Sequence, residues 1–179
     1  MTNLDRTIEG KLILITDFWH ESPRSAKTRP GFKEWSHFSV LGADFDLLVN
    51  FSLMSPAGTG AANRAIPRLT VLFADAEGWC DGDVEEFTEE ETDIVEARPH
   101  ARLKDNSVQF LGDHYRLNVA LSHRPLVVAL DLYPVVRPVI ANNVPLSSAE
   151  SVRWLVVPHL RARGEIVVAN KRYPTEQPR

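Results

Sequence analysis

The chain has 179 residues, enough for one domain with a substantial core and too few for two comfortable ones, so we expect a single domain over residues 1–179. A net charge of −4 and a pI near 5.9 argue against a nucleic-acid partner, because no basic stripe is available to neutralise phosphates. No apolar run reaches the roughly 18 to 20 residues that span a bilayer, so we expect no membrane span.

The single cysteine, Cys80, cannot form an intramolecular disulfide or build a cysteine-rich zinc site. The opening segment Met1–Arg6 does not lead into the apolar stretch of a signal peptide. Both features fit a reducing compartment, so we expect a cytoplasmic protein. We also expect its ends, residues 1–10 and 174–179, to be flexible.

Apolar residues recur mainly at period two, which is typical of half-buried β-strands. The clearest run alternates from Phe45 to Met54 and places its odd-numbered side chains on one face. The pattern predicts eight strands and hardly any helix: Lys11–Thr16, Phe45–Met54, Leu69–Ala74, Ser107–Leu111, Tyr115–Ser122, Leu126–Tyr133, Ser151–Val157 and Glu165–Ala169.

The strands over 115–122 and 126–133 are separated only by His123-Arg124-Pro125, which predicts an antiparallel hairpin. Gly112-Asp113 predicts the preceding turn. Successive strands joined by short breaks favour an all-β, antiparallel up-and-down meander, which buries its edges by closing into a barrel or by folding as a sandwich.

Four stretches do not fit regular strands. His20–Gly31 is expected to be a surface loop, and the Gly- and Ala-rich Ser55–Pro67 a rim over a pocket. Asp81–Glu96 holds nine acids and no base, so we expect a solvated acidic edge or loop, with a helical turn possible at Thr88–Glu91. Pro134–Pro145, with its prolines, predicts a crossing loop or an arm.

The motif Glu34-Trp35-Ser36-His37-Phe38 carries the chemistry that stands out. Glu34 and His37 are the candidate catalytic residues, although on a strand their odd spacing makes the two side chains diverge. The alternatives are that Glu34 bonds backbone groups or an arginine, and that His37 is a partly buried histidine. Asp46 and Asp131 are further candidate acids, with a solvent-facing position as the alternative for Asp131.

No pair of ligands has a recognised metal spacing, so we expect no metal and no cofactor. A nucleophilic triad is unsupported too, because Ser36 and His37 are merely neighbours in sequence and no nucleophile-elbow motif is present.

Glu34-Trp35-x-x-Phe38, the Tyr115 hairpin, Trp154-x-x-x-Pro158 and Gly164-x-Ile166 occur in an order and spacing that resemble the lipocalin-like carotenoid 1,2-hydratase (hydroxyneurosporene synthase) family. Related lipocalin-like natural-product cyclases, including Diels–Alderase types, share that architecture. The resemblance covers residues 11–173 and the first of that family's two barrels. It implies a lipocalin-like (calycin) barrel and carries Glu34, Trp35 and Trp154 over as motif residues, whereas Ser36 and His37 replace aromatics common in the family.

A closed barrel of about eight strands holds core side chains or one small apolar ligand. We therefore expect a hydrophobic polyene or isoprenoid-like ligand, with hydration or cyclisation as the reaction if the protein is an enzyme. Holding a reactive conformation would supply much of such catalysis. The residues expected to line the site are Trp35, Phe45, Leu47, Val49, Phe51, Tyr115, Val128, Leu130 and Trp154.

Two alternatives remain open at this point. The chain is a non-enzymatic lipocalin-type carrier, or it is one half of a two-barrel unit completed by a homodimer partner or by a second barrel domain. For the tryptophans Trp35 and Trp154, the alternative to ligand contact is packing in the barrel core or at its end.

Overall fold

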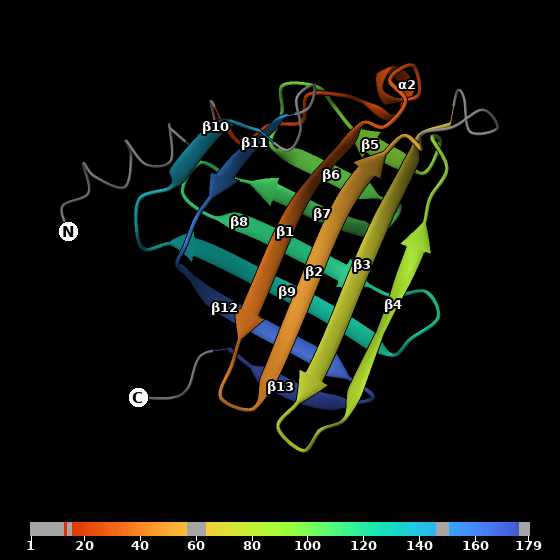
Figure 1. Ribbon diagram of the computed structural model, residues 1–179. Helices are drawn as coiled ribbons and strands as arrows, with labels where there is room; N and C mark the ends of the chain where they lie inside the picture. The colour runs from red at the N-terminus through yellow and green to blue at the C-terminus, as the bar shows by residue number, and fades with distance from the viewer. Residues whose placement is uncertain (1–12, 14–15, 57–63, 146–150, 176–179) are drawn as a thin grey trace.

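The computed structural model describes residues 13, 16–56, 64–145 and 151–175, and in these residues the protein is almost entirely antiparallel β-structure (Figure 1). The described elements are α2 (Pro23–Ala26), β1 (Lys33–Leu41), β2 (Phe45–Met54), β3 (Ile66–Asp75), β4 (Cys80–Glu86), β5 (Thr92–Ile94), β6 (His100–Leu103), β7 (Asn106–Phe110), β8 (Tyr115–Ala120), β9 (Leu126–Pro134), β10 (Val139–Pro145), β11 (Ser151–Val156), β12 (Leu160–Val168) and β13 (Lys171–Pro174). Among them, no helix has the length and apolar character needed to cross a membrane.

Strands β1 to β4 form a four-stranded sheet in chain order, called the front sheet below. The alternation predicted for Phe45–Met54 is confirmed, because β2 has these bounds and all its odd-numbered residues are buried. These residues face inward with Leu69, Val71 and Phe73 of β3. The even-numbered residues of β2 face outward, so the front sheet has an apolar inner face and a more polar outer face.

The back sheet has seven strands in the order β13-β12-β9-β8-β7-β6-β5. The predicted hairpin is confirmed, since β8 and β9 pair antiparallel from Tyr115↔Leu132 to Ala120↔Val127. The turn at Gly112 lies between β7 and β8, and its φ of 100° suits glycine. The two-stranded ribbon β10–β11 interrupts the meander between β9 and β12.

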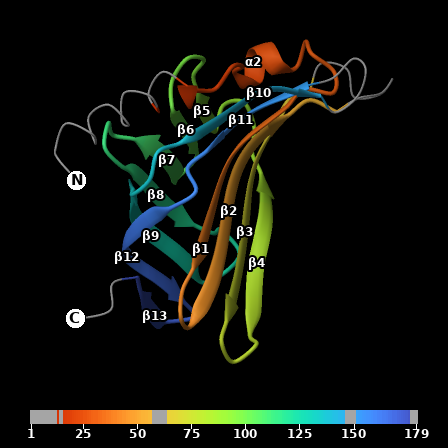
Figure 2. The same ribbon diagram turned by 60° about the vertical axis from the view of Figure 1, so that its left-hand side comes forward.

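The front and back sheets pack as two layers whose strands cross, with the ribbon running over one end (Figures 1 and 2). Aromatic rings join the layers, as in the edge-on contacts of Phe38 with Tyr115 at 5.4 Å and of Phe73 with Tyr173 at 5.0 Å. At the front sheet's edge, Glu85 accepts hydrogen bonds from the Ser122 backbone N–H at 2.5 Å and from its hydroxyl at 3.4 Å. These contacts surround one apolar core.

The sheets built from the described strands are open, and none closes on itself as a barrel. The prediction of an all-β, antiparallel meander is therefore confirmed, while the predicted single closed barrel is replaced by two facing sheets. The break falls between β4 and β5, which are consecutive in the chain but lie in different sheets. The acidic segment that joins them makes one hydrogen-bonded turn, in which the Thr92 N–H donates to the Glu89 carbonyl at 3.2 Å, one residue after the helical turn considered at Thr88–Glu91.

Other segments differ from their predictions. Within Lys11–Thr16, the described residues Ile13 and Thr16 are helical, so the strand predicted there is wrong at these positions, and the remainder lies outside the described residues. The acidic stretch contains β4, which forms the solvent-facing edge of the front sheet as expected for an acidic edge. Six observed strands were not among those predicted: β1, β4, β5, β6, β10 and β13.

The loop and arm predictions agree better with the structure. His20–Gly31 is irregular except for α2. Ser22 caps the start of this helix, because its hydroxyl oxygen accepts a hydrogen bond from the Ser25 N–H at 3.3 Å. Strand β10 pairs only with β11 and shifts register between Ala141 and Val144, so the region forms an arm. Residues 57–63 of the predicted rim, residues 1–10 and residues 176–179 lie outside the described residues, whereas Pro174 belongs to β13.

Candidate functional site

Glu34 and His37 lie on opposite faces of β1, as their spacing predicted. The two carboxylate oxygens of Glu34 accept hydrogen bonds from the His20 backbone N–H at 3.1 and 3.0 Å, and its Oε1 lies 2.5 Å from His20 Nδ1. The interpretation that Glu34 bonds a backbone group is thus confirmed. The structure does not bring Glu34 and His37 together as a dyad.

His20 joins Glu34 to the ribbon. Its Nε2 lies 3.4 Å from an Arg153 guanidinium nitrogen, and the Arg153 guanidinium also lies 5.6 Å from the centroid of the Phe18 ring. Arginine is always a donor, so this contact assigns His20 a proton on Nδ1 that it donates to Glu34. The arrangement holds the segment before α2 between β1 and β11. A catalytic role for Glu34 stays a prediction.

His37 is exposed on the outer face of the front sheet, so the interpretation of a partly buried histidine is wrong. Its Nε2 lies 3.1 Å from Ser39 Oγ, and its Nδ1 lies 3.4 Å from Asn50 Nδ2. These partners leave the imidazole accessible, and its proposed role in proton transfer stays a prediction.

Most of the expected ligand-lining residues lie together in the core. Seven of them expose between 0 and 7% of their surface: Phe45, Leu47, Val49, Phe51, Tyr115, Val128 and Leu130. The sequence therefore identified the inward-facing side chains correctly, and the structure packs them against one another.

The other two candidates, Trp35 and Trp154, lie outside the core. Trp35 is 40% exposed and Trp154 is 54% exposed, so packing in the core is wrong for both, whereas a position at one end fits Trp154. For Trp35 the reason is strand parity, because it is three residues from the inward-facing Phe38 and so points the opposite way. Trp154 lies on the ribbon, which covers one end of the layers and not the core (Figure 2).

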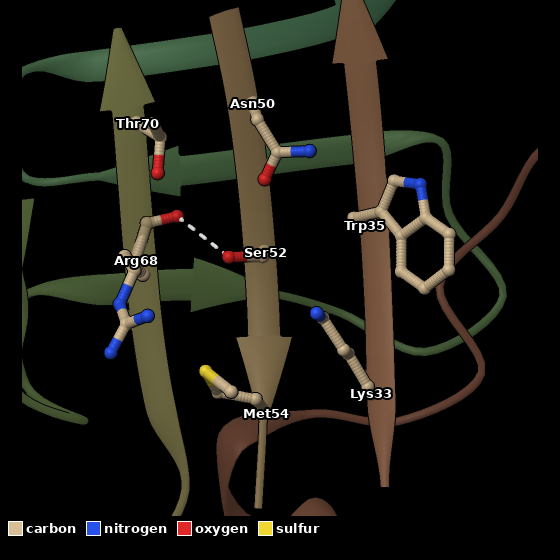
Figure 3. Close-up of a pocket in the computed structure, with 7 residues that line it drawn as sticks. All are labelled: Lys33, Trp35, Asn50, Ser52, Met54, Arg68 and Thr70. Atoms are coloured by element: carbon tan, nitrogen blue, oxygen red, sulfur yellow. Dashed lines mark hydrogen bonds between the residues drawn. The ribbon is translucent and has the colours of Figure 1, made fainter. Parts of the chain in front are cut away.

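A hollow of about 240 Å³ lies on the outer face of the front sheet. Figure 3 shows that side chains from three adjacent strands line it, with the indole of Trp35 along one side. The residues that line it are Lys33 and Trp35 of β1, Asn50, Ser52 and Met54 of β2, and Arg68 and Thr70 of β3. Apart from Trp35, sequence analysis missed these residues, because their outward position made them look like ordinary solvent-facing side chains.

The hollow combines a flat ring with hydrogen-bonding groups and positive charge. The Lys33 ammonium lies 5.8 Å from the centroid of the Trp35 ring. Arg68 donates to Glu86 at 2.6 Å, while the Ser52 hydroxyl donates to the Arg68 carbonyl at 3.4 Å (Figure 3). The Nε of Arg68 is buried and has no hydrogen-bond acceptor among the described residues. Such a site can stack a flat group and donate hydrogen bonds to an acceptor.

The candidate acids Asp46 and Asp131 both face outward. Asp46 is exposed, and Asp131 accepts a hydrogen bond from Arg116 Nε at 2.9 Å on the outer face of the back sheet. This hydrogen bond lowers the pKa of Asp131, which is therefore ionised at neutral pH and unsuited to donate a proton. The solvent-facing alternative for Asp131 is confirmed.

Asp17 is an acid that sequence analysis missed. It receives a hydrogen bond from the Tyr115 hydroxyl, and Tyr115 packs with Phe38 and with Phe110, whose ring centroid lies 4.7 Å away. Burial raises the pKa of Asp17, and burial together with the neighbouring Asp17 charge raises the pKa of Tyr115. Only the tertiary contact with Tyr115 distinguishes Asp17, so no local sequence signal could have found it.

Within the described ranges, no group of three or more His, Cys, Asp or Glu side chains is placed to hold a metal ion. No family model matches the chain, and no curated protein and no solved structure is significantly similar to it.

Proposed function

We propose that this protein binds a small organic molecule with a flat, apolar body in the hollow on the outer face of the front sheet. The observation that carries this proposal is the hollow itself, in which Trp35 borders polar side chains from the neighbouring strands β2 and β3. Ligand sites commonly join an apolar surface to a few fixed polar groups.

The strands give the hollow a rigid frame. Trp35, Ser52 and Arg68 are cross-strand partners in one continuous register, so their side chains stand side by side on the same face. A regular sheet fixes such groups with little further loss of conformational freedom on binding, which favours affinity.

The proposed ligand is still a polyene or isoprenoid-like molecule, but its proposed site is the hollow and no longer the interior between the sheets. The seven candidate residues of the core are packed together, so a ligand there would have to displace them. A lipocalin-like relationship to the carotenoid hydratase family stays part of this proposal, and it is the reason for choosing a polyene as the first probe.

Titration with retinol, a neutral polyene that quenches tryptophan fluorescence, tests the proposal. We expect saturable quenching by retinol. In Trp35→Ala the affinity for retinol should be at least tenfold lower, because the stacking surface is lost. Trp79→Ala is a matched control, since Trp79 is 41% exposed and lies just before β4, outside the residues that line the hollow. Equal affinity in the two variants would rule out the hollow as the site.

A second candidate function is acid catalysis of hydration or cyclisation, which the pair of Asp17 and Tyr115 favours. A carboxyl whose pKa is raised by burial is better able to deliver a proton to a double bond, and here it accepts a hydrogen bond from Tyr115, whose ring packs with Phe38 and Phe110. Incubation with an acyclic carotenoid should then give a product heavier by one water, or a cyclised isomer. Asp17→Asn should abolish product while retinol binding persists, and binding without any product would leave the carrier function.

As a partner, the ribbon favours a second copy of the same chain. Val139, Val144 and Trp154 expose 56, 39 and 54% of their surface, and exposed apolar clusters mark interaction surfaces. Light scattering over a concentration series should give a dimer that Trp154→Ala weakens. A strict monomer at all concentrations would argue against this partner.

A further inference from the structure

We propose that the ligand of the hollow is an amphipathic carboxylic acid, with its carboxylate beside Lys33 and Arg68 and its apolar chain directed along β2 and β3 toward Leu72. This inference rests on the proposed function and names the chemistry of its ligand. It follows from a gradient of charge and polarity along the outer face of the front sheet.

One end of the outer face is positively charged. Arg68 is paired with Glu86 at 2.6 Å, and Arg64 approaches the same carboxylate at 3.5 Å. Lys33 lines the hollow and makes no ion pair within the part of the chain that the structure describes. Two arginines thus share one carboxylate and Lys33 adds a third cation, on a protein whose net charge is −4.

Hydrogen-bond donors at this end are incompletely used. Arg68 carries five N–H donors and its side chain is 31% exposed at the hollow, while its Nε, which has no acceptor among the described residues, is buried. A carboxylate is the acceptor that arginine and lysine bind best, and a bound one would offset the excess charge. An uncharged head group would leave that charge without a partner.

Next to the hollow, the outer face has an apolar area over β2, β3 and β4. Two residues beyond the polar row of His37, Asn50 and Thr70, the register places Leu48 beside Leu72. Leu72 and the neighbouring Val84 are each 51% exposed. Gly82, the cross-strand partner of Leu72, carries no side chain to cover it. These residues offer an open apolar surface to a chain that leaves the hollow.

The two ends are a suitable distance apart. Arg68 and Leu72 are four residues apart on β3, which corresponds to about 13 Å along a strand. This matches the reach of a medium-length acyl or polyene chain. A sugar ligand would instead require polar groups along the whole path, whereas on β2 and β3 the row after Asn50 and Thr70 consists of Leu48 and Leu72.

The test compares cis-parinaric acid, a fluorescent polyene acid, with its methyl ester, using fluorescence titration of the full chain. We expect the acid to bind at least tenfold more tightly than the ester, because only the acid presents a carboxylate to Lys33. Lys33→Gln should lower acid affinity several-fold more than ester affinity, so that the ratio of the two affinities falls. Lys27→Gln, which removes a surface cation paired with Glu89, is the matched control and should change neither.

Leu72→Ser tests the apolar end. This exposed position tolerates the change, and we expect it to weaken the acid and the ester by the same factor, because both carry the same chain. Urea denaturation of each variant verifies that it is folded.

The outcomes separate the two proposals. Equal binding of acid and ester, or an acid preference that survives Lys33→Gln, would overturn the inference about the carboxylate while leaving the hollow as a binding site. If Leu72→Ser weakened neither probe, the assigned direction of the chain would be wrong. Failure of acid, ester and retinol alike to bind would instead overturn the proposed function.

Discussion

The two faces of the front sheet are made by the same strands and differ in almost every physical property. On β2, Phe51 is fully buried on the inner face, while its neighbours Asn50 and Ser52 line the hollow on the outer face. The inner face is a tightly packed part of the core, and the outer face is open and chemically mixed. A single strand therefore separates the residues that stabilise the fold from those proposed to bind a ligand.

The largest effect should come from the inner face. Phe51→Ala removes a ring that is 0% exposed and should lower the free energy of unfolding by about 3–5 kcal/mol. Urea denaturation measures this loss. Asn50→Ala on the opposite face should change stability by less than about 0.5 kcal/mol. A similar loss in both variants would break the distinction between the faces.

The outer face has one position at which substitution should be costly. Gly82 has a φ of 155°, and a Cβ there would lie 2.2 Å from the Val71 carbonyl oxygen. Gly82→Ala should therefore cost about 1–3 kcal/mol through backbone strain, although the residue is not in the core. Thermal unfolding checks this. A neutral result would show that β4 can move away from β3 without penalty.

Glu34 and His37, the inward- and outward-facing members of the motif at residues 34–38, give a finer comparison. Glu34→Gln removes the charge that accepts three hydrogen-bonding contacts from His20, and we expect a loss of about 1–2 kcal/mol. His37→Ala should stay within about 0.5 kcal/mol of wild type, because its contacts are exposed. Hydrogen exchange at His20 should quicken in the first variant only. The reverse ranking would contradict the positions assigned to the two residues.

The smallest effect concerns pH. Burial raises the pKa of Asp17 above its ordinary value of 3.8, so the folded protein loses stability as pH rises from that value through the raised pKa. Asp17→Asn cannot ionise, so its stability relative to wild type should improve from pH 4 to pH 7. Urea denaturation over that range measures the difference.

Asp131 provides the control of opposite sign. Its hydrogen bond from Arg116 lowers its pKa, so the stability it contributes is present above the ordinary value of 3.8 and is lost as pH falls through the lowered pKa. Asp131→Asn should therefore be closest to wild type in acid. If both variants shifted in the same direction, the contrast between the two carboxyls would be incorrect.

Period-two alternation predicted much of the fold because a strand with one buried face must alternate. Phe45–Met54 and the hairpin from Tyr115 were found this way. Strands β4 and β5 lie within an acidic segment, where the charges concealed any alternation. Whether the sheets close or stay open depends on how distant edges meet, and no local pattern encodes that.

The candidate site was harder to predict than the fold. Parity correctly separated Glu34 from His37, yet the search for a pocket followed the inward-facing residues. Ser52 and Arg68 are sixteen positions apart and ordinary in sequence, and only the register of β2 with β3 places them side by side. Asp17 likewise becomes unusual only through Tyr115, which lies far along the chain.

The ribbon has a consequence for how the chain is connected. It leaves the back sheet after Pro134 and returns at Leu160, and these two residues are themselves cross-strand partners. The base is closed by the Val135 N–H, which donates to the His159 carbonyl at 3.0 Å. Because its ends meet, the segment acts as an insertion in a β9–β12 hairpin, and the entropic cost of closing such a loop grows only slowly with its length. Replacing residues 135–159 by a short turn should therefore keep β9 and β12 in register while removing the contact between Arg153 and His20.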